Sequence, residues 1–121
     1  MNYDPDVAPD SVEWLALSEA ERIEVIEEHH RESGIPAGNM TAHAGIDAAV
    51  ETQLAEGLPE VRHALDRLVN GGVPRPEALH AIGAVLAEEI FKVLKHGKSF
   101  DIGVYAKRLK SISPSTLEAK E

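Results

Sequence analysis

Residues 74–96 read PRPEALHAIGAVLAEEIFKVLKH, and this stretch decides the fold. Prolines stand at its start, where a helix tolerates them, and Gly97 follows it, where a helix commonly ends. At about 100° per residue, apolar residues cover one side and continue onto the other: Leu79, Ile82, Leu86, Ile90 and Val93 against Ala81 and Val85. A helix that is apolar nearly all round is usually central. We therefore expect a long fifth helix against which the others pack.

Signals of helix starts and stops recur on both sides of this stretch, and no strand-like alternation persists. They predict a short helix from residue 11, then helices over 18–33, 41–57, 59–70, 74–96 and 101–112. Residues 113–121 lack periodicity and are expected to form a flexible C-terminal tail. The sequence thus predicts an all-α fold. We expect a single domain over 1–112, built as a compact array of five to six helices around the fifth.

The third and fifth predicted helices resemble each other. His43 and Glu51 in one align with His80 and Glu88 in the other at an offset of 37 residues, and each helix precedes a glycine-containing break and a further helix. Helix pairs of nearly this length build HEAT and armadillo solenoids, which usually need about three copies. Repeated helix pairs are therefore an alternative form of the predicted array.

Composition excludes several kinds of site. None of the 121 residues is cysteine, which rules out disulfides, thiolate metal sites and a cysteine nucleophile. No apolar run reaches the roughly 20 residues of a membrane span, and the start does not have the basic and apolar segments of a secretory signal. We therefore expect a cytoplasmic protein that binds no membrane.

Charge is unevenly distributed along the chain. Residues 1–60 hold 14 acidic and 2 basic residues, residues 61–121 hold 7 and 10, and the net charge is −9. Affinity for nucleic acid comes mainly from neutralising phosphates, so an acidic chain is a poor general binder. We expect no nucleic-acid partner, and we interpret the basic cluster at residues 107–110 as a solvated helix face.

Histidines are the first candidates for chemistry, and the chain has six. Helical projection places His30, His43 and His80 on or beside apolar faces. An imidazole buried without a hydrogen-bond partner costs about 2–7 kcal/mol, so each needs a polar neighbour. The candidate neighbours are Asp47, Glu51, Gln53, Glu77 and Glu88. We expect a buried histidine–carboxylate network that includes His30 and Gln53, with His43 and His80 facing the core and meeting. Glu88 projects toward the polar side and can pair with Lys92 one turn on.

A metal site is the alternative interpretation of these residues. Glu-x-x-His places a carboxylate and an imidazole on one helix face, as in di-iron bundles, and the string occurs three times, including Glu77 with His80. Acids in a first helical turn are also favoured by the helix dipole alone. A mononuclear zinc or iron site of His43, His80 and one of Glu51, Glu77 or Glu88 stays open beside the structural network.

Three segments carry a family resemblance: DPDVAPD (4–10) followed by EWLAL (13–17), His43 with VETQ (50–53), and EALHAIG (77–83). Together they resemble an uncharacterised bacterial domain-of-unknown-function family, over nearly the whole chain apart from the tail. Members commonly have Glu-Asn-Gln where this chain has Glu51-Thr52-Gln53, and often Glu-His where it has Glu88-Glu89. The resemblance implies a bacterial helical protein and supplies no activity.

The sequence favours a non-enzymatic helical interaction or structural module without a cofactor. Its partner would be another protein or a second copy of the chain. The alternative is a metal-binding protein or metal-dependent enzyme that holds a divalent transition metal at His43, His80 and nearby carboxylates.

Overall fold

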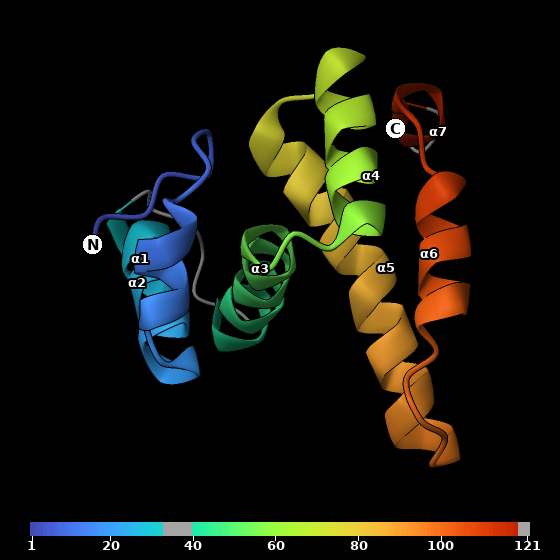
Figure 1. Ribbon diagram of the computed structural model, residues 1–121, viewed down its shortest axis with the longest axis horizontal. Helices are drawn as coiled ribbons and strands as arrows, with labels where there is room; N and C mark the ends of the chain where they lie inside the picture. The colour runs from blue at the N-terminus through green and yellow to red at the C-terminus, as the bar shows by residue number, and fades with distance from the viewer. Residues whose placement is uncertain (33–39, 119–121) are drawn as a thin grey trace. The chain divides into compact units, whose positions relative to one another are not determined.

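The computed structural model describes residues 1–32 and 40–118, and these residues form helices and no strand. The helices are α1 (Ser11–Ala16), α2 (Glu19–Glu32), α3 (Met40–Ala55), α4 (Pro59–Asn70), α5 (Arg75–His96), α6 (Ile102–Lys110) and α7 (Pro114–Glu118) (Figure 1). The all-α prediction is confirmed. The predicted end of the second helix at residue 33, and residues 119–121 of the predicted tail, lie outside the described residues.

Contacts divide the chain into two compact units, Met1–Leu58 (the N-terminal unit) and Pro59–Glu121 (the C-terminal unit). In the N-terminal unit α3 packs against α1 and α2, and in the C-terminal unit α4, α5 and α6 pack against one another. Helices α1 and α2 therefore pack against α3. Helices α4 and α6 pack against α5, as expected for a central fifth helix. A single domain over 1–112 stays a prediction, since two compact units can belong to one domain.

The repeat of helix pairs is not confirmed. It would match the pair α3 and α4 with the pair α5 and α6. Instead, α3 belongs to the N-terminal unit with α1 and α2, whereas α4 packs with α5 and α6 in the C-terminal unit.

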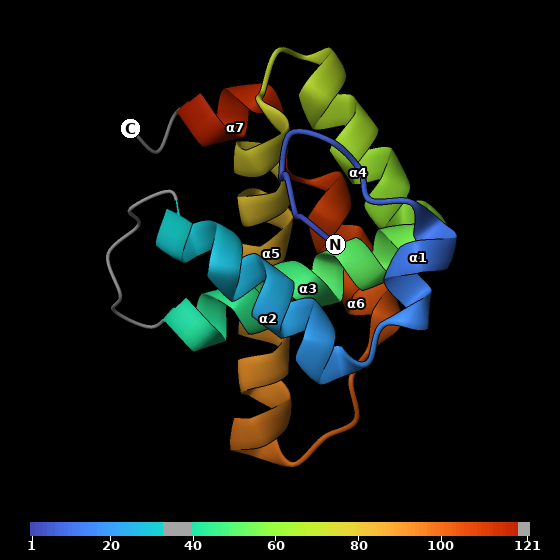
Figure 2. The same cartoon turned by 90° about the vertical axis from the view of Figure 1, so that its left-hand side faces the viewer.

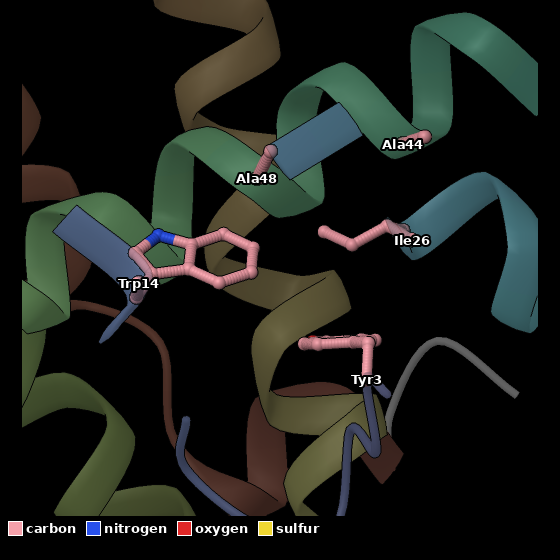
Figure 3. Packing of buried hydrophobic residues seen from close by; sticks show 5 residues of the cluster. All are labelled: Tyr3, Trp14, Ile26, Ala44 and Ala48. Carbon is pink, nitrogen blue, oxygen red and sulfur yellow. The ribbon is translucent and has the colours of Figure 1, made fainter. Parts of the chain in front are cut away.

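Trp14 is at the centre of the N-terminal unit. Its side chain is fully buried with Tyr3, Ile26, Ala44 and Ala48, as Figure 3 shows. The two alanines leave room on α3 for the indole and the isoleucine. The indole Nε1 also donates to Thr52 Oγ1 at 3.0 Å, so its one polar atom is satisfied in the core.

A capping box begins α2, close to the predicted helix start at residue 18. The Ser18 amide donates to Glu21 Oε1 at 2.9 Å, and the Glu21 amide donates to Ser18 Oγ at 3.2 Å. The Ser18 hydrogen bonds lower the pKa of the Glu21 carboxyl. Two amides at the helix start, which have no partner within the helix, are satisfied in this way.

The core of the C-terminal unit is built from three helices. The buried residues include Val61, Ala64, Leu65 and Leu68 of α4, Leu79, Ile82 and Leu86 of α5, and Tyr105 and Leu109 of α6. These residues recur every three or four positions, which is the period of one face of an α-helix. No helix in the described part of the chain is long and apolar enough to cross a membrane.

A short helix, α7, stands where the sequence analysis expected an irregular tail. Ser113 begins it: the Ser113 amide donates to Thr116 Oγ1 at 2.8 Å, and the Thr116 amide donates to Ser113 Oγ at 3.3 Å. This is the same reciprocal capping that begins α2, with threonine in place of glutamate. The cap signal is present in the sequence, but five residues are too few to show a helical period.

Candidate functional site

A hollow of about 750 Å³ lies between α5, the end of α6 and α7 in the C-terminal unit. On α5 its lining residues recur every three or four positions, from Glu77 through His80, Ala81 and Ala84 to Glu88. They form a stripe about 17 Å long at 1.5 Å per residue. Figures 1 and 2 both show α7 at the same end of the unit as the N-terminal turns of α5.

The wall opposite α5 is held in place by α4. The Arg67 guanidinium donates to the Leu109 carbonyl at 2.7 Å, in the last turn of α6, and to the Ile112 carbonyl at 3.1 Å, just after that helix ends. Just beyond, Pro114 packs against Gly71 so closely that a Cβ at position 71 would overlap the proline ring. Arg67 and Gly71 therefore fix the turn that carries α7 to the hollow.

One end of the hollow is charged. Arg108 of α6 bridges two carboxylates of α5, with Nη2 at 2.5 Å from Glu88 Oε2 and Nη1 at 2.6 Å from Glu89 Oε2. Lys92 Nζ lies 3.0 Å from the same Glu89 oxygen. Glu89 is buried, whereas Glu88 is exposed. The predicted pairing of Glu88 with Lys92 is wrong, because Arg108 reaches Glu88 from α6 and Lys92 bonds to Glu89 three residues before it.

These contacts fix the charges in the cluster. The hydrogen bond from Lys92, followed by that from Arg108, lowers the pKa of the Glu89 carboxyl. The hydrogen bonds to Glu88 and Glu89 raise the pKa of the Arg108 guanidinium. The cluster therefore joins two glutamates to an arginine and a lysine, and its polar atoms are directed at each other.

Neither Glu89 nor Arg108 was expected at a site from the sequence. The interpretation of residues 107–110 as a solvated helix face is wrong for Arg108, which bonds to Glu88 and to the buried Glu89. A signal for Glu89 was present, since it lies three residues after Leu86 and seven after Ile82, on the apolar stripe of its helix. A carboxylate at such a position needs a buried partner. Which cation supplies that partner depends on how α6 packs, and the spacing of residues along the chain does not reveal it.

His43 and His80 do not face the core, so that prediction is wrong: both side chains are exposed. On α3 the face toward Trp14 and Ile26 carries Ala44 and Ala48, because the indole needs small neighbours. His43 lies one position before that face. His80 and the exposed Glu77 instead line the end of the hollow formed by the first turns of α5.

Glu51 is a buried member of the N-terminal unit. It is 2% exposed, and the Tyr3 hydroxyl donates to its Oε2 at 2.5 Å. Tyr3 also lies with its ring centroid 6.0 Å from that of Trp14 and 5.8 Å from that of His29. Tyr3, which the sequence analysis did not consider, thereby joins the N-terminal segment to α2 and α3.

His30 and Gln53 occupy different places in the N-terminal unit. His30 is buried, its Nε2 lies 3.5 Å from Asp47 Oδ2, and its Nδ1 has no hydrogen-bond partner among the described residues. Gln53 is half-buried and lines a smaller hollow of about 360 Å³ between α2 and α3. Asp47 is thus the carboxylate beside His30.

The proposed metal ligands are divided between the two units. His43 and Glu51 belong to the N-terminal unit, and Glu77 and His80 belong to the C-terminal unit. Within the described ranges, no three histidine, aspartate or glutamate side chains form a group that could hold a metal ion. The metal alternative stays a prediction.

Comparison with protein-family models, with curated proteins and with solved structures gave no match. Membership of the bacterial family that the sequence resembles stays a prediction.

Proposed function

We propose that this chain is a non-enzymatic binding module whose hollow holds one amphipathic helix of a protein partner. The observation that carries the proposal is the shape and lining of the hollow: a half-open space of about 750 Å³ with an apolar middle and charged ends. Grooves of this kind bind partner helices through apolar residues spaced three, four and seven apart.

The length of the hollow matches a short helix. Its stripe on α5, about 17 Å long, equals the rise of about 11 or 12 helical residues. Ala81 and Ala84 form the floor, and their small side chains let a second backbone approach α5 closely. Val85, Ile112 and Leu117 line the hollow around this floor and supply apolar contacts.

The charged cluster supports binding over catalysis. Glu88 and Arg108 form an ion pair at one end of the hollow. Such a pair can still accept or donate hydrogen bonds to polar groups of a partner at the rim, and this needs no proton transfer. Glu77, at the other end, would favour a basic residue of the partner helix.

A peptide selection tests this proposal. A display library of helical peptides of about 12 residues is selected against the folded chain, and the enriched peptides are measured by fluorescence anisotropy. Ala84→Glu places a charge on the floor at an exposed position and should weaken binding at least about tenfold. Ala20→Glu makes the same change at an exposed alanine of α2 and should leave binding unchanged.

Circular dichroism and thermal melts show whether both variants remain folded. The proposal fails if no helical peptide is enriched. It also fails if the enriched peptides bind Ala84→Glu as tightly as the wild type.

A further inference from the structure

The last turns of α5 expose large apolar side chains beside basic ones. Phe91 is 62% exposed and Leu94 is 78% exposed. Lys95 Nζ lies 6.0 Å from the centroid of the Phe91 ring. Phe91, Leu94 and Lys95 share one face of the helix by their spacing, and we call them the tip patch. Figures 1 and 2 both show this end of α5 extending past α4.

The tip patch has the features of a contact surface. Its two apolar side chains lie close together on one helix, whereas isolated exposed apolar residues are normal and need no explanation. Lys98, exposed just after the helix, adds a second positive charge. None of the three patch residues lines the hollow, so this surface is separate from the proposed peptide site.

A complementary surface is present on the same chain. Glu24, Glu28 and Glu32 are exposed and follow one another every fourth residue on α2, so they share one face and repel one another. Arg31 is the nearby base, and the first 60 residues hold 14 acids against 2 bases. A cation placed against this face relieves the repulsion between the carboxylates.

We propose that the tip patch of one chain binds the acidic face of α2 on a second copy of the chain. The lysines would meet carboxylates, while Phe91 and Leu94 would pack on the methylene stems of the glutamates. A net charge of −9 opposes approach to any anionic surface, whether a second copy or a phosphatidylserine membrane, so the contact between copies depends on the local pairing of lysines with glutamates. The two surfaces differ, so the contact is heterologous. Two copies can make the contact twice in a dimer, several copies can close into a ring, or the assembly can keep adding copies.

Light scattering coupled to size-exclusion chromatography tests the contact over a range of concentrations. The mass should rise above that of the monomer as concentration rises. The rise should be larger at about 0.05 M salt than at about 0.5 M salt, because the attraction is screened. Phe91→Ser with Leu94→Ser should abolish the increase.

Charge reversal identifies the partner surface. Lys95→Glu with Lys98→Glu should abolish association, and so should Glu24→Lys with Glu28→Lys. An equimolar mixture of these two variants should associate, because the reversed tip of one meets the reversed α2 of the other. Lys107→Glu with Lys110→Glu changes the net charge equally on α6 and should leave association intact.

Four results would overturn the inference. The first is a monomer at every concentration and salt. The second is an equimolar mixture of the two charge-reversed variants that does not associate. The third is self-association that Ala84→Glu removes and the tip variants leave intact. The fourth is a monomer that binds phosphatidylserine vesicles through Phe91 and Leu94. Peptide binding in the hollow is measured at concentrations where the chain is monomeric. The proposed peptide site is therefore tested independently of the proposed self-association.

Discussion

The two units use their polar residues in different ways. In the N-terminal unit polar groups lie inside and bond to the core: Tyr3 to Glu51, and Trp14 to Thr52. The C-terminal unit also buries a carboxylate, Glu89, but its partner Arg108 bonds to the exposed Glu88 as well, at the edge of a hollow with an apolar middle. Under the proposed function, the buried Glu51 contributes to folding, whereas the groups that would meet a partner surround the hollow.

The largest effect should come from breaking the N-terminal core. Trp14→Ala removes a fully buried indole and its hydrogen bond to Thr52, and it should lower the free energy of unfolding by about 3–5 kcal/mol. Urea unfolding followed by circular dichroism measures this. Leu15→Ala changes a neighbour that is 40% exposed and should cost under about 1 kcal/mol. Equal losses of unfolding free energy in the two variants would contradict the burial of Trp14 in the core.

Tyr3→Phe tests whether the buried carboxylate is structural. The variant keeps the ring beside Trp14 but removes the hydroxyl that donates to Glu51, leaving the carboxylate with one donor fewer. The free energy of unfolding should fall by about 1–3 kcal/mol. Chemical denaturation measures the loss, and peptide binding in the hollow should not change at a temperature where both proteins are folded. A variant as stable as the wild type would show that the hydrogen bond between Tyr3 and Glu51 does not stabilise the fold.

Arg108→Gln tests the charged cluster through its pH dependence. Because Lys92 and Arg108 lower the pKa of Glu89 in the folded chain, the carboxylate stabilises the fold at neutral pH. That stabilisation should be lost as the pH falls below 4.5, the ordinary value, through the lowered pKa. The melting temperature of Arg108→Gln should therefore lie below that of the wild type at pH 7, and the gap should narrow toward pH 3. A gap that is constant with pH would contradict the assignment.

Two glycine substitutions should give the smallest effects, one on peptide binding and one on stability. Gly71→Ala should displace Pro114 and weaken peptide binding, because α7 then leaves the hollow. Gly45→Ala lies inside α3 with nothing within 4 Å of the added Cβ. It should raise the free energy of unfolding by about 0.5–1 kcal/mol, since glycine costs conformational entropy in a helix. Thermal melts and anisotropy measure both variants, and unaltered peptide binding by Gly71→Ala would remove the proposed role of that contact.

The helices could be predicted from the sequence because their signals are local. The capping box at Ser18 and Glu21 and the apolar period of α4 depend on neighbours within a few positions. The full buried surface of α3 could not be predicted in this way. Its apolar spacing points to Val50 and Leu54, and both are buried. Packing against Trp14 and Ile26 also buries Ala44 and Ala48, whereas His43 is exposed.

The candidate site depends on contacts between residues that are distant in sequence. Arg67 reaches Leu109 and Ile112 across more than 40 residues, and Arg108 reaches Glu88 across 20. Neither pairing follows from a helical period, so the hollow was not foreseen. Glu77 and His80 were identified as candidates from their spacing on one helix face, and they do line the same hollow.

The most direct test of the central claim is nuclear magnetic resonance mapping of the bound peptide. An enriched helical peptide is added to the labelled chain, and changes in amide chemical shift are followed. If the hollow is the binding site, the changes should centre on His80, Ala84, Glu88 and Leu117. Changes centred on the N-terminal unit, around Tyr3 and Glu51, would contradict the claim.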